Sequence, residues 1–305
     1  RGCPRRERDF KKSRGLLCEK PAVKYSFIYK HRHRYSVRRM CRVLSVSPSG
    51  YYDWVGRPPS ARSQRLTAQI QVLHQASRET YGAQRIHRDL VKVGEVVGRN
   101  TVAMLMQRGG IVPKTVRRFR VTTDSRKTRP APNILQREFS VPAPNRYWVS
   151  DMTFIPTREG WLYPTVILDL FSRVVVGWSM DRRMTSTMNI DALQMALSHR
   201  GGQAPALLHS DQGSQYAAAD YQAMLKTHNI SCSMSRKGNC WDNSVAESFF
   251  HTLKTELVHH EDYQSRDAAR TSIFEYIEVF YNRQRRNSHL DQQAPLTYEM
   301  MTTSH

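Results

Sequence analysis

The sequence predicts an α/β protein in which a mixed sheet flanked by helices follows a set of all-α, helix-turn-helix-like units. Three observations support this fold class. The 305 residues correspond to about two domains. Residues 1–140 carry 32 basic and 9 acidic side chains, whereas residues 141–305 carry 15 and 17. Apolar residues recur at helical spacing in the first part, and β-branched and aromatic runs separated by short turns begin near residue 145.

The N-terminal part divides into a basic segment, two helical units and a linker. Residues 1–34 are basic with little apolar periodicity, and residues 35–60 have apolar residues at helical spacing on either side of the breaker SVSPSG. This pattern predicts a helix-turn-helix-like unit, although a plain packed helix pair explains it equally well. GRPPSARS (56–63) is typical of a linker. A second helical, DNA-binding unit is expected over 61–120, and a polar linker over 121–144.

The second helical unit contains three expected helices, at about 66–77, 83–93 and 100–108. Gly109 and Gly110 stop the third helix, as a C-terminal glycine does. The basic run KTVRRFR (114–120) follows.

Residues 145–305 are expected to form one α/β domain with C-terminal helices. Three strand-like runs, RYWVSDMTFI, WLYPTVILDLF and SRVVVGWSM, predict an antiparallel meander. Helices and strands then alternate. Strands are expected at ALLHSD and ISCSMS, and helices at about 187–199, 217–228, 244–259 and 266–284. The order β-β-β-α-β-α-β-α-α predicts a mixed sheet with helices on its faces.

Several classes of protein are excluded by what the sequence lacks. No apolar run is long enough for a membrane helix, and no apolar segment follows the basic N-terminus as in a secretory signal. The five Cys form no CxxC pair, which disfavours a disulfide scaffold or structural zinc site and favours a reducing cytosol. Neither a Gly-rich phosphate loop nor a GxSxG elbow is present, so a nucleotide cofactor and a hydrolytic triad are unsupported.

The first part of the chain has a net charge of +23 and the second part a net charge of −2, so all of the excess positive charge in the total of +21 lies in the first part. Such a field attracts a polyanion, and nucleic acid is the expected partner. A solvated basic surface that serves only solubility is the alternative. The candidate phosphate-contacting residues are Arg38, Arg39, Arg42, Arg117 and Arg118.

Three carboxylates in the second part are candidates for a catalytic, metal-binding site. Asp151 lies inside the first apolar strand, Asp211 follows the fourth strand, and Glu247 lies in the helix after NCWDNS. Each has a structural alternative: a water-facing strand edge for Asp151, an Asx-type turn for Asp211, and an S-x-x-E capping box for Glu247. Together, two carboxylates on neighbouring strands and one on a covering helix can converge on one point.

Clustered carboxylates repel one another, and hard divalent cations relieve the repulsion. Two Mg²⁺ ions, with Mn²⁺ as a plausible substitute, would suit the oxygen ligands and an in-line phosphoryl displacement. Lys254 stands two turns after Glu247 on the same helix side, where a cation could hold a DNA-end phosphate. An ordinary exposed lysine is the alternative.

Three blocks resemble the catalytic blocks of DDE transposases, and most closely those of the insertion sequence three family of bacteria. They are DMTFI (151–155), HSDQGSQY (209–216) and GNCWDNSVAESFFHTLKTEL (238–257). Asp211 and Glu247 have 35 residues between them, the spacing of this family and of retroviral integrases. VRRMCRVLSVSPSGYYDW (37–54) and YGAQRIHRDL (81–90) resemble the family's N-terminal helical blocks, whereas QRRNSHLDQQAPLTYEM (284–300) follows its closing pattern only loosely.

The resemblance implies a ribonuclease H-like domain and a Mg²⁺-dependent DDE polynucleotidyl transferase. Cleavage at a transposon end would free a 3′-OH, and that 3′-OH would attack another phosphodiester. The expected partners are double-stranded DNA, both transposon ends and target, and further copies of the chain; the expected location is the bacterial cytoplasm, associated with the nucleoid. The absence of an initiator Met suggests a trimmed chain or a product joined to an upstream segment.

Two other functions stay open at the level of the sequence. A non-catalytic DNA-binding remnant would repress its element without any Mg²⁺-dependent strand cleavage. A simple nuclease of the same fold would cut DNA and never join it.

Overall fold

The computed structural model describes residues 19–56, 60–114, 131–236 and 240–303. The chain divides into two compact units. The first unit comprises Arg1–Leu73 and Asp89–Val112, and the second comprises His74–Arg88 and Pro113–His305. No helix in the described part combines the length and low polarity that crossing a bilayer requires.

The first unit begins with three helices around a small core. They are α3 (Pro21–His31), α4 (Val37–Val43) and α5 (Pro48–Gly56). Helices α4 and α5 confirm the expected helix pair, and Met40, Leu44 and Tyr51 are buried between them and α3. Helix α3 was not predicted, because it buries only Lys24 and Ile28 and has almost no amphipathic pattern.

Three further helices confirm the second predicted helical set. They are α6 (Ala61–Ala76), α7 (Ala83–Lys92) and α8 (Arg99–Arg108). Helix α6 starts earlier than expected, so the predicted linker 56–63 is wrong at its C-terminal end. Gly109 caps α8, and Gly110 follows with a φ of +66°, which glycine adopts without a Cβ clash.

A mixed sheet forms the centre of the second unit. Its main strands are β1 (Tyr147–Met152), β3 (Gly160–Asp169), β4 (Val175–Asp181), β5 (Leu207–Ser210) and β6 (Ser231–Met234). Strands β1, β3 and β4 pair antiparallel, whereas β5 runs parallel to β1 and β6 parallel to β5. The resulting order, β4-β3-β1-β5-β6, confirms the predicted ribonuclease H-like mixed sheet.

The first expected strand is divided in two. The chain leaves the sheet after Met152 and re-enters as β2 (Ile155–Thr157), which pairs with the first residues of β3. The apolar run 146–155 therefore contains a break that hydrophobic patterning did not indicate.

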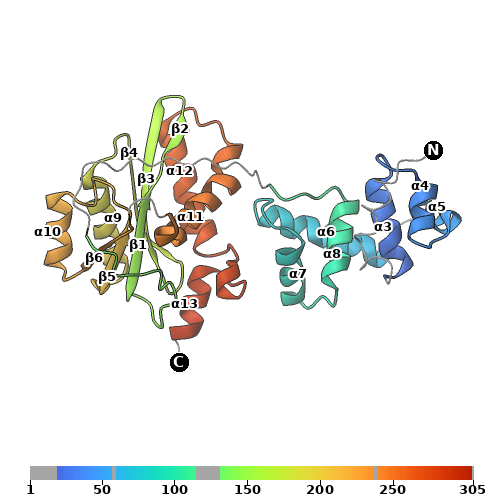
Figure 1. Cartoon of the computed structure of the whole chain (residues 1–305), viewed down its shortest axis with the longest axis horizontal. Coiled ribbons are helices and arrows are strands. Elements are labelled where there is room, and N and C mark those ends of the chain that lie inside the picture. The colour runs from blue at the N-terminus through green and yellow to red at the C-terminus, as the bar shows by residue number, and fades with distance from the viewer. Residues whose placement is uncertain (1–18, 57–59, 115–130, 237–239, 304–305) are drawn as a thin grey trace. The chain divides into compact units, whose positions relative to one another are not determined.

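Helices cover both faces of this sheet (Figure 1). One face carries α9 (Ser186–His199) and α10 (Ala219–Thr227), and the other carries α11 (Ser244–Glu256) and α12 (Arg266–Glu275). Helix α9 approaches β4 closely at Gly177, where a Cβ atom would lie 2.2 Å from the Ala192 carbonyl oxygen. A larger residue at this position would push the helix off the sheet.

The end of the chain is more broken than the sequence suggested. The expected helix 266–284 becomes π-helical over Tyr276–Tyr281 after α12, and α13 (Pro295–Thr303) was not predicted. Short 3₁₀ turns lie at Cys240–Asn243, Val258–His260 and Ser288–Leu290.

Candidate active site

The sheet register places Asp151 and Asp211 beside each other. In the parallel pair of β1 and β5, Val149 lies opposite His209, and each aspartate follows its strand partner by two residues. Since side chains two residues apart share a face of the sheet, the two carboxylates project to the same side. Strand β1 is internal, between β3 and β5, so the interpretation of Asp151 as a water-facing edge residue is wrong.

Each aspartate is oriented by one backbone N–H group. The Oδ1 atom of Asp151 accepts from the Met152 N–H at 2.9 Å, and Oδ1 of Asp211 accepts from the Gly213 N–H at 2.9 Å. The second bond is the Asx-type turn that was the structural alternative for Asp211. In the described part of the chain neither Oδ2 atom accepts a hydrogen bond, so each carboxylate keeps a free oxygen.

Glu247 lies in the first turn of α11, which is fixed to the strand that carries Asp151. The Asn243 side-chain amide donates to the Ser150 carbonyl oxygen at 3.1 Å. Glu247 itself is exposed, while Phe250 and Leu253 of the same helix are buried against the sheet.

The predicted capping box before Glu247 is wrong. Asn243, not Ser244, occupies the N-cap position, and no side chain caps the first turn. Ser244 is already helical, so the S-x-x-E spacing does not explain why a glutamate stands at position 247.

The three carboxylates interact through their charges. Burial raises the pKa of Asp151 well above its usual range, and the charge of Asp211 raises it further, with a smaller contribution from Glu247. Burial also raises the pKa of Asp211. The pKa of Glu247 is raised by partial burial and then by Asp211. Such uncompensated acids are typical of functional sites.

The aspartate pair is the tighter part of this cluster. Among the described residues, no three His, Cys, Asp or Glu side chains converge closely enough to surround one ion. The structure therefore brings Asp151 and Asp211 together and leaves Glu247 facing them from α11. An all-oxygen set of carboxylates that raise one another's pKa fits a hard divalent cation, which would relieve their repulsion.

Lys254 is half-buried on α11, unlike an ordinary exposed lysine. Its Nζ atom lies 4.7 Å from the ring centroid of Phe154, which stands beside the break between β1 and β2. Burial lowers the pKa of Lys254, and the charge of Asp151 opposes this shift. The lysine is therefore within electrostatic range of the aspartate pair.

Asp242 is a buried acid that sequence reasoning missed. It is completely buried and accepts hydrogen bonds from the side chains of Arg137, Arg236 and Asn133 at 2.8–2.9 Å. These bonds hold the residues just before α11, and thereby the approach to Glu247. The signal was present in the sequence, because NCWDNS places an acid next to the predicted helix start.

The candidate phosphate-contacting residues of the first unit lie on one helix. Arg38, Arg39 and Arg42 are exposed on α4, whereas Met40 and Cys41 between them are buried. Arg117 and Arg118 lie outside the described residues.

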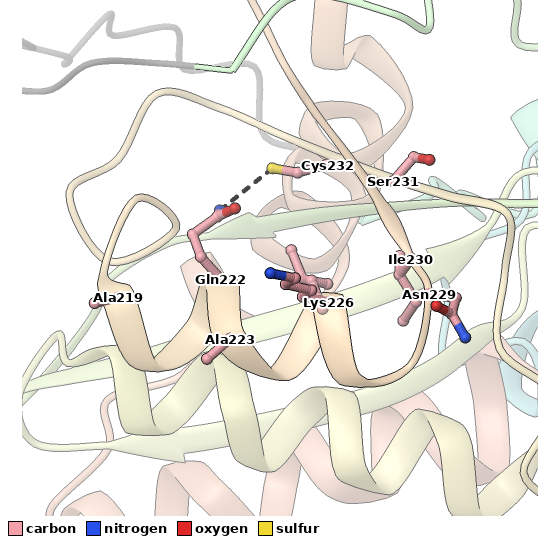
Figure 2. A pocket seen from close by; sticks show the side chains of 9 residues that line it. Ala219, Gln222, Ala223, Lys226, Asn229, Ile230, Ser231 and Cys232 are labelled. Carbon is pink, nitrogen blue, oxygen red and sulfur yellow. Dashed lines mark hydrogen bonds between the residues drawn. The ribbon is translucent and has the colours of Figure 1, made fainter.

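A hollow of about 680 Å³ runs along α10 and β6, away from the carboxylates (Figure 2). Its walls come from Ala219, Lys226 and their neighbours, and Gln222 donates to the Cys232 sulfur at 3.3 Å across it. No candidate site residue contributes to this hollow.

Family models match most of the chain. Integrase core domain models match residues 141–240 and 247–303, and an HTH-like domain model matches residues 61–119. The second core match begins at Glu247, and the first contains both aspartates.

Two curated bacterial proteins are similar over most of their length. The chain is 45% identical over 263 residues to the insertion element IS600 uncharacterized 31 kDa protein of Shigella sonnei, covering 85% of this chain and 97% of that protein. It is 41% identical over 283 residues to the transposase InsF for insertion sequence IS3A of Escherichia coli, covering 91% and 98%.

Among solved structures, the magnesium complex of the HTLV-2 integrase catalytic core domain is 18% identical, with a TM-score of 0.40, and the match covers 52% of this chain and 98% of that one. The fold assignment rests on the strand order and the family matches. An identity above 40% along nearly the whole of a transposase, together with the integrase core and HTH-like domains, shows that this chain belongs to the insertion sequence three family of DNA transposases, which are polynucleotidyl transferases.

Proposed function

We propose that Asp151, Asp211 and Glu247 are the catalytic residues of this transposase, and that together they bind two Mg²⁺ ions, for which Mn²⁺ can substitute. The observation that carries the proposal is the aspartate pair at the ends of β1 and β5. Both carboxylates have raised pKa values, and no arginine neutralises either of them within the described residues.

The side chains are prepared for this role by their own hydrogen bonds. Met152 and Gly213 each orient one oxygen of an aspartate, which leaves the other oxygen free to bind a cation. When bound, the ions activate the attacking oxygen and stabilise the leaving oxygen of a phosphodiester. Glu247 would join them from α11, whose start is held by Asn243.

The reaction follows from what the family does to DNA. Water attacks the phosphodiester at an element end and frees a 3′-OH, which then attacks a second phosphodiester. Lys254 would hold a phosphate of the element end beside the aspartates, because it is the half-buried cation within electrostatic range of Asp151.

The basic N-terminal part would bind the same DNA. Arg38, Arg39 and Arg42 are exposed and would contact backbone phosphates, and the HTH-like domain over 61–119 supports binding of double-stranded element ends and target. Arg117 and Arg118 join this proposal on sequence alone. We expect several copies to assemble on the DNA, in the bacterial cytoplasm where the nucleoid lies.

The test is strand chemistry on labelled element-end DNA with Mg²⁺, comparing the parent chain with Glu247→Gln. Gln keeps the side-chain shape and removes the metal-binding charge. The matched control is Glu261→Gln, which neutralises an exposed acid outside the site.

The expected result is nicked and joined strands from the parent and the control, and none from Glu247→Gln. DNA binding without strand chemistry in all three proteins would contradict the proposal and favour a DNA-binding remnant. Nicked strands that are never joined would favour a simple nuclease.

A further inference from the structure

A second charged site lies on α11, beside the face that carries Glu247. A cavity of about 350 Å³ is bounded by this helix, the loop after the π-helix and the turn between β3 and β4. We call it the arginine pocket and define it by Arg85, Arg173, Arg285, Ser244, Ser248 and His289.

Arg173 is a buried guanidinium with an unused donor group. Its side chain lies in the β3–β4 turn and is only 5% exposed. Its Nη2 atom donates to the Phe139 carbonyl oxygen at 3.1 Å and to Nε2 of His289 at 2.8 Å. Since a guanidinium cannot accept a hydrogen bond, His289 Nε2 must be the acceptor.

The Nη1 atom of Arg173 is buried and has no hydrogen-bond partner among the described residues. No carboxylate there forms an ion pair with Arg173 either. A buried cation with unsatisfied donors destabilises the folded state. An acceptor that enters from outside the protein would remove that cost.

Positive charge exceeds negative charge around the pocket. Arg285 forms a two-pronged pair with Glu256, at 2.8 Å for each bond, and Arg85 lies 3.6 Å from the same carboxylate. One acid therefore faces two arginines, and Arg173 adds a third. No acidic residue of the described chain lines the cavity, so its lining carries an excess of positive charge.

Hydroxyl groups complete the lining. Ser244, Ser248 and Thr252 stand at i, i+4 and i+8 along one stripe of α11, and all three border the cavity. Their side-chain hydroxyls make no hydrogen bond to the described part of the chain. Ser244 is in the first turn, where the positive end of the helix dipole also favours an anion.

We propose that the arginine pocket binds a phosphate group, and that the group belongs to the backbone of the DNA on which the enzyme acts. Arginine forks with hydroxyl donors suit a tetrahedral oxyanion better than a carboxylate, because they supply donors from several directions. At 3.6 residues per turn, the Ser244–Ser248–Thr252 stripe lies about 110° around α11 from Glu247 and Lys254. A duplex phosphate bound here would hold DNA against the helix that presents Glu247.

The inference that the phosphate belongs to DNA rests on the proposed function. The inference that the pocket binds a phosphate group does not. Replacing Arg173 would also remove its bond to Phe139 and could unfold the turn. The test therefore uses Ser248, an exposed helix residue. Ser248→Asp places a negative charge at the pocket, and Ser248→Asn is the neutral control of equal size.

The first measurement is calorimetric titration of the full chain with inorganic phosphate, without metal and at constant ionic strength. The parent and Ser248→Asn should bind one phosphate per chain, and Ser248→Asp should bind at least tenfold more weakly. No phosphate binding by the parent, or equal phosphate binding by the two variants, would overturn the proposal that the arginine pocket binds phosphate.

The second measurement is the anisotropy of a labelled element-end duplex over a salt series, again without metal. Ser248→Asp should bind at least fivefold more weakly than Ser248→Asn, and the slope of log K against log salt should fall by about one, as expected for one lost phosphate contact. Equal DNA binding by the two variants, with phosphate binding still different, would overturn the inference that the bound phosphate belongs to DNA. If the two variants differ in both phosphate binding and DNA binding but the parent joins no strands, the proposed function is overturned and the pocket is supported.

Discussion

Two groups of acidic side chains in the second unit have opposite electrostatic surroundings. Asp242 and Glu256 lie at the two ends of α11 and are matched by arginines. Hydrogen bonds from Arg236 hold the pKa of Asp242 far below its usual range. Burial alone would raise the pKa of Glu256, but hydrogen bonds and charge from Arg285 outweigh it and lower the pKa.

Asp151 and Asp211 are half-buried nearby, and neither forms an ion pair with an arginine among the described residues. Burial raises the pKa of both aspartates, and the charge of Asp211 raises the pKa of Asp151 further. This contrast identifies the acids that stabilise the fold. Paired acids hold the ends of α11 in place, whereas unpaired acids cost stability and, under the proposed function, would bind a cation that comes from outside the chain.

The largest expected effect is a loss of strand joining without a loss of stability. Asp211→Asn should lower strand joining by about a thousandfold or more, as loss of a core catalytic group does. The free energy of unfolding should stay equal or rise by up to about 1 kcal/mol, because a like-charge repulsion with Asp151 disappears. Parallel joining assays and urea denaturation measure the two quantities, and a strongly destabilised Asp211→Asn would contradict the comparison.

The opposite result is expected at Glu256, where loss of the carboxylate should lower the free energy of unfolding. Glu256→Gln leaves Arg285, with a side chain only 9% exposed, as an unpaired buried cation. The expected loss of unfolding free energy is about 3–5 kcal/mol. Glu275→Gln breaks the exposed pair with Arg78 and should cost less than about 1 kcal/mol. Similar urea midpoints for the two variants would show that Glu256 does not stabilise the fold more than an exposed acid does.

A smaller effect is expected from the titration of Asp242. Because its folded pKa is depressed, its contribution to stability is complete above the usual value of 3.8 and is lost as the pH falls through the folded pKa. Asp242→Asn should therefore be less stable than the parent by about 2 kcal/mol near neutral pH. The gap should close as the pH drops below 3.8. A gap that is constant down to the lowest pH with folded protein would refute the ionic role.

The smallest expected effect concerns Lys254. Lys254→Gln should weaken binding to element-end DNA by a few-fold and reduce the salt slope by about one, since one phosphate contact is lost. Stability should change by less than about 1 kcal/mol, because the side chain is only half-buried. Unchanged salt dependence would leave Lys254 with a packing role against Phe154.

Most of the sheet could be predicted from the sequence, because its signals are local. Runs of β-branched residues mark the strands, and hydrophobic spacing marks α9 and α11, so the expected neighbourhood of Asp151 and Asp211 is confirmed by the register of β1 and β5. The catalytic roles stay predictions. The expectation of a second helical, DNA-binding unit over 61–120 agrees with the matched HTH-like domain over 61–119, whereas the helix-turn-helix-like role of residues 35–60 stays a prediction.

Other features depend on contacts between distant residues and left no local pattern. Helix α3 is stabilised by rings such as Tyr25 and Tyr29 that pack on Trp54, and its own sequence has no apolar stripe. The capping box failed because the 3₁₀ turn Cys240–Asn243 moves the helix start by one residue. The arginine pocket joins residues from positions 85 to 289, so no sequence window contains it.

The central claim is that Asp151 and Asp211 are left unpaired in order to bind a divalent cation. The most direct measurement is the thermal unfolding midpoint of the parent and of Asp151→Asn, each in Mg²⁺ and in a chelator at equal ionic strength. Ligand binding to the folded state alone raises the midpoint. We expect Mg²⁺ to raise the unfolding midpoint of the parent and to leave that of Asp151→Asn unchanged. The effect should weaken as the pH is lowered, because protons then compete with the cation. Equal midpoints in Mg²⁺ and chelator for the parent, or an equal rise in both proteins, would contradict it.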